Sequence, residues 1–494
     1  MAVDQSAIAR VVGIETKFQD LRAGRILYLP QQIAVIGQGN TANTYATTPV
    51  QVTNAQAVAT AYGFGSPLHK AVEQLFPING DGVGTIPVTV YPVQAGGSAV
   101  AATGDITVTG TATRQFTGTL RIGGVESLEF VVPEGTAAAS VGAILNAAIS
   151  GVLDMPVTSA PTVEGSGVDL TAKWAGITGN DLQIEVLEAP ADAGITFSIS
   201  AMFEGAISPD ISGALALIGS RWTTMIVNAA APYTDTGALD DYSTFGNGRW
   251  GDLVRKPLTV YTGTVETNAT TLKTAGDLRR SDSVNVLIPV PGAKSTPWQI
   301  AARAVSRIAA VAQNNPARDY GSQKLNGIIA GTDGQQFDYP TRDLLVKSGI
   351  STTELKDGVV NLSDTVTFYH PEGDPLPAYR FVKTITKLQQ VIYNLDLEFA
   401  TEKWDGAPLI PNDQPTTNRE AKKPKTAVAA ANVIIGNLGL EALISDPETA
   451  KAATVAQIST QNPDRLDLSV TVQVSGNANI VSAVLNFGFY FGGQ

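Results

Sequence analysis

The stretch SVNVLIPVPGAKSTPWQIAARAVSRIAAVAQ, residues 283–313, decides the class of fold. Its first eight residues form an apolar run of strand length, which proline and glycine then end. Thr296 followed by Pro297 is the order of residues that commonly starts a helix. Ile300 and Ile308 recur at helical spacing and therefore share one face of that helix. A buried strand followed at once by an amphipathic helix predicts an α/β unit.

The same alternation continues on both sides of this stretch. Short apolar runs typical of buried strands alternate with segments of helical period, so we expect a mixed sheet with flanking helices. The predicted strands are residues 33–36, 86–93, 222–228 and 256–263, and the predicted helices are residues 66–76, 213–220 and 269–280. We assign this α/β core to residues 31–97 and 206–330, after an N-terminal arm at residues 1–30.

The composition changes between these two halves of the core. Residues 98–205 are rich in Thr, Gly and Val, and their polar and apolar residues alternate as in strands. Gly123 and Gly124 predict a hairpin turn, and Thr136 is the expected cap of a helix that runs to Ile149. The pattern predicts a self-contained, β-rich α+β domain inserted into the core.

A further domain is predicted at residues 331–476. It begins with a short helix in RDLLVKSG, and DGVVNLSDTVTFYH (357–370) is typical of a hairpin. Helices are expected at residues 380–404 and 426–443, separated by a Pro-rich polar connector.

The end of the chain is distinctive. Residues 466–474 alternate apolar and polar side chains, which predicts a strand with one buried face. Residues 480–491 then place Val481, Leu485, Phe487 and Phe489 on one face, within a predicted C-terminal arm at residues 477–494. A long apolar terminal strand aggregates unless another strand pairs with its edge.

Composition excludes several classes of function. The 494 residues include no cysteine and two histidines, so thiolate sites are absent and histidine-based metal or catalytic sites are disfavoured. The net charge of −12 argues against a nucleic-acid partner. Charged residues are 16% of the chain, against about 25% in typical domains. This indicates a surface covered by neighbouring subunits or a neutral polar surface, and both interpretations stay open.

No signal peptide or membrane span is expected, so folding in the cytoplasm without membrane insertion is predicted.

A dinucleotide-binding motif is the strongest enzymatic candidate. Gly37, Gly39 and Ala42 fit G-x-G-x-x-A after a strand, but no acidic residue lies between Asp20 and Glu73 to bind a ribose. We therefore favour a strand that ends in a glycine turn and a loop. PGAKST likewise lacks the glycine that a phosphate loop needs before its lysine.

The remaining polar candidates have ordinary explanations. His69 is expected on a helix surface and His370 at a loop tip, and Asp240 with Asp241 on a solvated face. A basic cluster of Arg419, Lys422, Lys423 and Lys425 is interpreted as a solvated linker, with contact to an acidic partner as the alternative. We predict no enzyme, no catalytic residue and no cofactor.

Several stretches in order resemble one family. They are LPQQIAVIGQGN (29–40) with PVQVT (49–53) and FGSPL (64–68), WAGITGNDLQIEV (174–186), residues 342–369, PNDQPTTNRE (411–420) and the paired final strands. Together they resemble the Mu-like contractile bacteriophage tail sheath proteins over essentially the whole chain.

The resemblance implies a structural protein of the virion, assembled in the host cytoplasm. Its subunits would form stacked rings of six around an inner tail tube, with baseplate and tail terminator proteins as further partners. Contraction would drive the tube through the host envelope. By the same resemblance residues 98–205 would be an outer domain. The family does not indicate which residues contact the tube, and the helix expected at residues 426–443 with the basic cluster before it is our candidate.

The resemblance also implies that arms at residues 7–18 and 480–491 add strands to neighbouring subunits, on a sheet that includes residues 358–369 and 466–474. The implied arm residues are Ile8, Val11, Val12, Ile14, Val481, Leu485, Phe487 and Phe489, and the implied accepting residues are Val366, Phe368, Leu468, Val470 and Val472.

Two alternative functions stay open. A baseplate or decoration component of a phage tail would form a fixed small oligomer, and a nucleotide-dependent enzyme would use the strand at Ile33.

Overall fold

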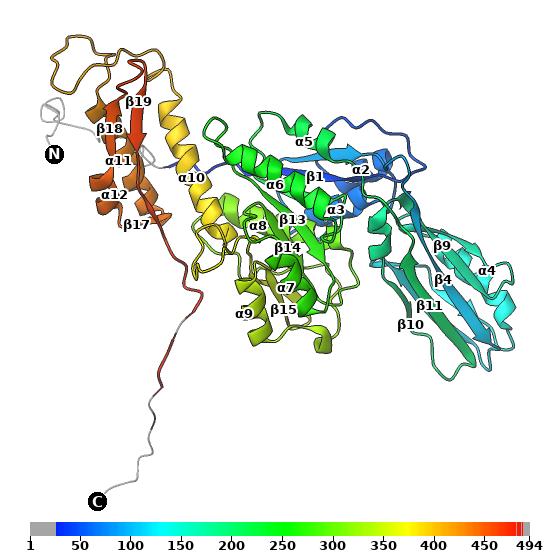
Figure 1. The fold of residues 1–494 in the computed structure, drawn as a ribbon. Coiled ribbons are helices and arrows are strands. Elements are labelled where there is room, and N and C mark those ends of the chain that lie inside the picture. The colour runs from blue at the N-terminus through cyan, green and yellow to red at the C-terminus, as the bar shows by residue number, and fades with distance from the viewer. Residues whose placement is uncertain (1–25, 481, 486, 488–494) are drawn as a thin grey trace, which may run out of the picture. The chain divides into compact units, whose positions relative to one another are not determined.

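The computed structural model describes residues 26–480, 482–485 and 487, and its chain divides into two compact units (Figure 1). The first, here the α/β unit, contains residues 29–390 and the described residues from Asn477 onward. The second, here the C-terminal unit, contains residues 391–476 together with residues 26–28.

A six-stranded sheet forms the centre of the α/β unit, in the order β14-β13-β12-β1-β3-β2. All neighbouring strands run parallel except β2, which is antiparallel to β3 at the edge. The strands are β1 (Ile33–Gln38), β2 (Val50–Val52), β3 (Val88–Val93), β12 (Met225–Ala229), β13 (Thr259–Thr264) and β14 (Asn285–Pro289). The prediction of a mixed sheet with flanking helices is confirmed.

Both faces of this sheet are covered, which explains why its strands are continuous apolar runs. In β1, Ile33 and Val35 pack in the core on the face of α3 and α8, whereas Ala34 and Ile36 pack in the core on the face of α5 and α6. These helices are α3 (Pro67–Leu75), α8 (Pro297–Asn314), α5 (Ser212–Ile218) and α6 (Thr236–Trp250). Helix α2 (Ala55–Tyr62) packs on α3, and α7 (Ala269–Asp277) packs on α9 (Tyr339–Lys347).

The start of α8 agrees with the sequence prediction. Pro297 is its first residue, and Gln299 Oε1 accepts from the N–H of Thr296 over 2.8 Å and from its hydroxyl over 2.9 Å. Helix α6 was not predicted, because its polar residues and three glycines give no apolar period. Its start is fixed by Asp235, whose carboxylate accepts from the N–H of Ala238.

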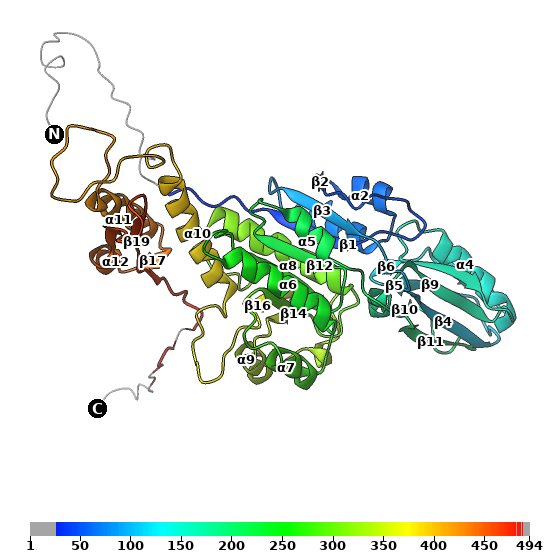
Figure 2. The same cartoon turned by 45° about the horizontal axis from the view of Figure 1, so that its top comes forward.

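The inserted segment contains two antiparallel sheets and one α-helix, which Figures 1 and 2 show gathered at one end of the α/β unit. One sheet has the order β11-β4-β9-β8, and the other has β10, β6 and β7 around β5. The elements are β4 (Ala101–Gly110), β5 (Phe116–Ile122), β6 (Val125–Glu126), β7 (Phe130–Val132), η1 (Ala138–Ser140), α4 (Val141–Ser150), β8 (Val157–Pro161), β9 (Gly167–Ala175), η2 (Ile177–Asp181), β10 (Ile184–Leu187) and β11 (Ile195–Phe203).

Two local predictions for this segment have different outcomes. Gly123 and Gly124 form the β5–β6 turn with φ of 55° and 79°, values that glycine adopts without strain. Thr136 does not cap the helix, because a short 3₁₀ segment intervenes and α4 begins only at Val141.

The inserted segment is not self-contained in packing. Its buried residues belong to the same hydrophobic cluster as one face of the central sheet. The rings of Trp174 in β9 and Trp298 in α8 meet edge to face at 5.7 Å, and Lys294 pairs with Glu185 at 3.1 Å. The domain limits at residues 98 and 205 stay a prediction.

The predicted hairpin after α9 is displaced along the chain. Its strands are β15 (Thr352–Lys356) and β16 (Val359–Asp364), joined at Asp357 and Gly358. Residues 365–370 lie beyond it, so the prediction of a hairpin within residues 357–370 was wrong. The short η3 (Asp333–Gln335) precedes α9, and α10 (Val382–Phe399) follows the hairpin and crosses from one unit into the other.

In the C-terminal unit, α11 (Pro424–Leu440) packs against three short strands. The single strand predicted at residues 466–474 is broken into two, which pair with different neighbours: β19 (Leu466–Ser469) with β18 (Val455–Ile458), and β20 (Gln473–Val474) with β17 (Ile444–Ser445). Helix α12 (Pro447–Ala453) completes the unit.

Two glycine substitutions test the packing of α8 on the sheet. A Cβ on Gly263 in β13 would lie 2.1 Å from the carbonyl oxygen of Pro297, whereas a Cβ on Gly213 in α5 would meet no atom within 4 Å. We expect Gly263→Ala to destabilise the α/β unit by about 1–3 kcal/mol through overpacking. Gly213→Ala should stabilise it by roughly 0.5–1 kcal/mol because alanine favours a helix.

Chemical denaturation of both purified variants measures this difference. Equal stability of the two variants would contradict the close approach of α8 to β13.

Candidate assembly interfaces

The C-terminal segment presents apolar side chains to solvent. Its described residues 480, 482–485 and 487 form no helix or strand. Leu485 is 85% exposed and Phe487 is 81% exposed, and Ile480 and Val484 are exposed to a similar degree. Exposed apolar residues this close together are typical of a surface that another chain covers. The other predicted arm residues, Ile8, Val11, Val12, Ile14, Val481 and Phe489, lie outside the described residues.

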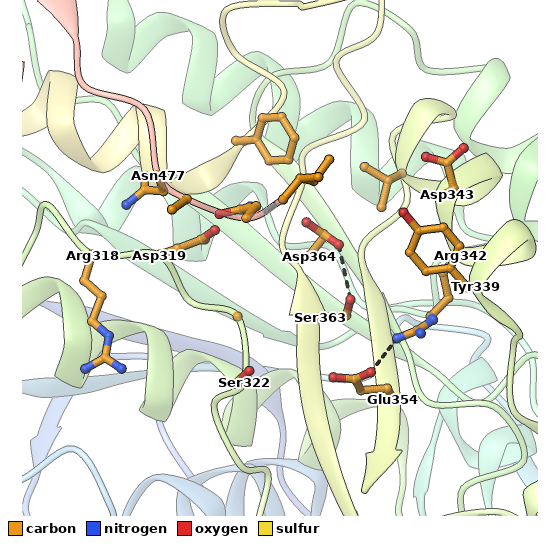
Figure 3. A pocket seen from close by; sticks show the side chains of 16 residues that line it. Arg318, Asp319, Ser322, Tyr339, Arg342, Asp343, Glu354, Ser363, Asp364 and Asn477 are labelled. Carbon is orange, nitrogen blue, oxygen red and sulfur yellow. Dashed lines mark hydrogen bonds and ion pairs between the residues drawn. The ribbon is translucent and has the colours of Figure 1, made fainter. Parts of the chain in front are cut away.

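This segment starts at a cavity of about 700 Å³ on the α/β unit (Figure 3). Residues 477–480 form one wall, and the other walls come from residues 318–322, α9 and the β15–β16 hairpin. The Asn477 side chain accepts a hydrogen bond from Lys387 Nζ over 2.8 Å and donates one to the carbonyl oxygen of Ala317 over 2.9 Å. Sequence reasoning missed Asn477, because one asparagine in a polar stretch carries no pattern.

Most charges around this cavity are paired. Arg342 bonds Glu354 at 2.8 Å, and Lys383 bonds Asp319 at 2.6 Å. Asp364 accepts from the Ser363 hydroxyl over 3.2 Å, and burial raises the pKa of its carboxyl (Figure 3).

Two of the predicted accepting residues lie in the interior of the α/β unit. Val366 and Phe368 are buried, and their N–H groups donate to Ser351 Oγ and to the Asn285 carbonyl oxygen. The outer edge of β16 is also occupied, because Leu325 donates to Val360 and Leu362 donates to Gln323. This part of the hairpin therefore offers no open edge to a strand from another chain.

The other three predicted accepting residues lie in the C-terminal unit. Leu468, Val470 and Val472 are half-buried, and only Leu468 lies within a strand. Among the described residues, β18 and β19 pair only with each other, so each has one open edge. The structure thus divides the five predicted accepting residues between two units and does not bring them into one sheet.

The glycine motif after β1 is explained by packing. The N–H of Gly39 donates to the hydroxyl of Tyr45 over 3.0 Å, and this hydroxyl bonds the Val93 carbonyl oxygen over 3.1 Å. A Cβ on Gly37 would lie 2.9 Å from that of Ala229 on the neighbouring strand. A loop and not a helix follows the motif, as predicted. Tyr45 occupies the N–H that a phosphate would need.

His69 lies in a helix as predicted, but both histidines are buried where exposed positions were expected. His69 is buried in α3, where its Nδ1 accepts from the N–H of Gly65 over 3.1 Å, and burial lowers the pKa of its ring. His370 is also buried, with Nδ1 2.6 Å from the Phe368 carbonyl oxygen and Nε2 3.2 Å from Asp277 Oδ1. The group that bonds His69 belongs to a turn, and Asp277, which bonds His370, is distant in sequence. Local sequence patterns therefore could not predict that the two histidines are buried.

The basic cluster before α11 is only partly solvated. Lys422 is buried with its ammonium 5.8 Å from the ring centre of Trp404, and Lys423 donates to the Asn412 carbonyl oxygen. Arg419 and Lys425 are exposed. The contacts of Lys422 and Lys423 therefore help to set the conformation of the Pro-rich connector before α11. Asp240 is exposed as expected, and it pairs with Arg279 at 2.8 Å.

The described residues contain no group of three or more His, Cys, Asp or Glu side chains that could hold a metal ion. Within the same residues, no helix is long and apolar enough to cross a membrane.

Asp181, at the end of η2, has a carboxyl group whose protonation changes near neutral pH. Burial raises the pKa of its carboxyl to about 7. It lies near Tyr233, whose pKa is raised to about 12 by burial and by Glu266, with a smaller effect of Asp181 itself. Above this pKa, the ionised Asp181 carboxylate lowers the stability of the folded chain at the place where the inserted segment meets the core.

Asp181→Asn tests this charge. Because the folded pKa lies above that of an unfolded aspartate, the native chain loses stability as pH rises from about 4 to about 7, and no further above it. We expect the variant to melt at a higher temperature than the natural chain, with a gap that widens over this range and then stays constant. A gap that does not change with pH would contradict the buried carboxylate.

Comparison with known proteins places this geometry in context. No family model matches the chain. The sheath tail protein of Desulfitobacterium hafniense has a TM-score of 0.47 at 12% identity, covering 94% of this chain and 100% of that one. The anti-feeding prophage helical sheath in its contracted state has a TM-score of 0.50 at 9% identity, covering 97% and 99%. The similarity to the anti-feeding prophage sheath shows that the two proteins share a fold.

The sequence comparison is more specific. The Mu-like prophage FluMu tail sheath protein of Haemophilus influenzae is 26% identical over 445 residues, which cover 88% of this chain and 86% of the relative. The aligned region therefore includes most of both chains. The resemblance of this chain to the Mu-like contractile tail sheath proteins is confirmed.

Proposed function

We propose that this protein is the structural subunit of a contractile tail sheath. It polymerises as stacked hexameric rings around an inner tail tube and contracts to drive the tube through the host envelope. The observation that carries the proposal is the exposure of four apolar residues near the end of the chain, Ile480, Val484, Leu485 and Phe487, in a chain that resembles a tail sheath protein. The protein is then a component of the virion, and its role is mechanical and not enzymatic.

Strand exchange explains the exposed segment. An added strand gains main-chain hydrogen bonds, while alternate side chains set its register. The chain offers both parts of such a joint: an apolar donor at residues 480–491 and open edges on β18 and β19. Contacts that run head to tail and do not close produce helical filaments, as a sheath requires.

The C-terminal unit is the favoured acceptor. A two-stranded sheet such as β18–β19 is marginal by itself and gains stability from further strands. Leu468, Val470 and Val472 are therefore better candidates than Val366 and Phe368, whose backbone N–H groups are already bonded. The N-terminal arm at residues 7–18 is proposed to add to the same sheet from another neighbour.

Helix α11 is the proposed contact to the inner tube. Within its span, Val433 is 60% exposed and Leu440 is 85% exposed, and Lys425 is its one charged residue. An apolar, weakly charged helix face suits a protein partner better than solvent. Baseplate and tail terminator proteins are proposed at the two ends of the sheath, and assembly is proposed in the host cytoplasm.

Electron microscopy of the purified chain tests polymerisation. We expect long tubes with a sixfold cross-section from the full chain. A truncation that removes residues 480–494 should stay folded and soluble, because the described residues of this segment pack little against the chain, but it should form no tubes.

Far-UV circular dichroism and a thermal melt provide the folding control for the truncation. Normal tubes from the truncated chain would contradict the arm assignment. Discrete small particles from the full chain would favour a baseplate or decoration protein, and saturable nucleotide binding would favour the enzyme.

Cysteine cross-linking tests the acceptor, and the cysteine-free chain makes it specific. We expect Leu485→Cys combined with Leu468→Cys, Val470→Cys or Val472→Cys to form intermolecular disulfides, since paired strands bring cysteines within bonding distance. At least one pair should convert most of the assembled protein into a ladder of covalent multimers on a non-reducing gel.

Two matched controls accompany this experiment. Leu485→Cys with Val366→Cys examines the buried alternative, and Leu485→Cys with Val163→Cys examines a fully exposed site in the inserted segment. A ladder as strong from either control would refute acceptance by the C-terminal unit.

A further inference from the structure

Asn477 is the point at which the chain returns to the α/β unit before its end. Its planar amide fits two partners at once: the carbonyl oxygen accepts from Lys387 Nζ at 2.8 Å, and Nδ2 donates to Ala317 at 2.9 Å. Lys387 lies in α10, and Ala317 lies three residues after the end of α8. One neutral side chain therefore joins the last segment to two separate parts of the unit.

The partner ammonium is deeply buried. Lys387 is 1% exposed, and burial lowers the pKa of its amine to about 8, with Lys383 acting in the same direction. A buried ammonium needs hydrogen-bond acceptors, because its separation from water is costly. The Asn477 oxygen supplies one of them. This hydrogen bond involves a charged donor and belongs to the stronger class.

The two attachment points are themselves connected. The hydroxyls of Tyr320 and Thr386 bond at 2.7 Å, and both residues are buried. This contact joins the chain after α8 to the turn of α10 that carries Lys387. Asn477 is thus bonded to a hydrogen-bonded part of the fold that continues through α8, which packs on the central sheet.

The described apolar residues after this point are exposed. Asn479 donates its N–H to the Asn477 carbonyl oxygen over 2.9 Å, and Ile480, Val484 and Leu485 are then each more than four-fifths exposed. Figure 3 shows Asn477 at the edge of the cavity, where the segment passes along one wall. The change from fixed to exposed chain occurs within three residues.

We propose that Asn477 is the positioning residue of the C-terminal arm: it fixes the arm's origin to the α/β unit and transfers tension on the arm into α8 and α10. This inference rests on the proposed sheath function. It assigns the origin of the arm to the α/β unit and not to the C-terminal unit that precedes it in sequence. An arm with a fixed origin reaches a neighbouring subunit in one direction, which lowers the entropic cost of strand exchange.

Spin-label distances in the monomer test the attachment itself. Labels at Ser482→Cys in the arm and Leu344→Cys on the exposed side of α9 report the position of the arm on the α/β unit. We expect Asn477→Ala to broaden the distance distribution at least about twofold, because both hydrogen bonds are lost. Asn479→Ala, two residues away, is the matched control and should leave the distribution unchanged.

Tube formation then tests the role in assembly. We expect Asn477→Ala to reduce tube yield about tenfold, the order of effect of losing a hydrogen bond to a charged group. Asn479→Ala should assemble as the natural chain does. If Asn477→Ala does not fold, Lys387→Met replaces it, since an apolar residue tolerates burial and removes the same bond.

The outcomes separate the two proposals. An unchanged distance distribution in Asn477→Ala would overturn the attachment, whether or not the natural chain forms tubes. A broadened distribution with normal tubes would overturn its role in assembly. Absence of tubes from the natural chain would refute the sheath function, while the monomer distances would still decide the attachment.

Discussion

The packing of the first turn of α8 is the contact on which the α/β unit depends. Pro297 lies so close to β13 that Gly263 leaves no room for a side chain, and Trp298 meets Trp174 of the inserted segment. Farther along the helix, Arg303 and Arg307 both bind Asp81 in the loop after α3. One helix thus connects the sheet, the insert and the neighbouring helix, so a small shift of α8 would disturb all three.

The two places predicted to accept a strand differ in whether their edges are covered. In the α/β unit, segments of the same chain cover β16, and helices cover both faces of the central sheet. In the C-terminal unit, the described parts of β18 and β19 each leave one edge unpaired. Unpaired edges attract other strands. The proposed acceptor is therefore the C-terminal unit, whose two-stranded sheet strands from neighbouring subunits would extend.

The sequence predicted the elements whose pattern is local and strong. The continuous apolar run of β1 and the capped, periodic α8 could be read directly, because burial on both faces and helix capping each leave a signal. Helix α6 left no such signal in the sequence, since its glycines and polar residues interrupt the helical period of apolar residues. The burial of His370 depends on Asp277, 93 residues away, and the break at Val470 depends on two different partner strands. Contacts between residues that are far apart in the sequence leave no local sequence pattern.

The charge distribution agrees with assembly through backbone and apolar contacts. Residues 477–494 contain no Asp, Glu, Lys or Arg, although 16% of the whole chain is charged. Ion pairs such as Arg303 with Asp81 lie inside the α/β unit, where they hold loops to helices. An uncharged arm gains little from charge attraction, whose effect salt would screen. The proposed strand exchange would therefore depend on main-chain hydrogen bonds and buried apolar side chains, which persist inside a host cell and outside it. Asn477, at the start of the arm, makes a charge-assisted contact with Lys387, whose burial protects this hydrogen bond from the same screening.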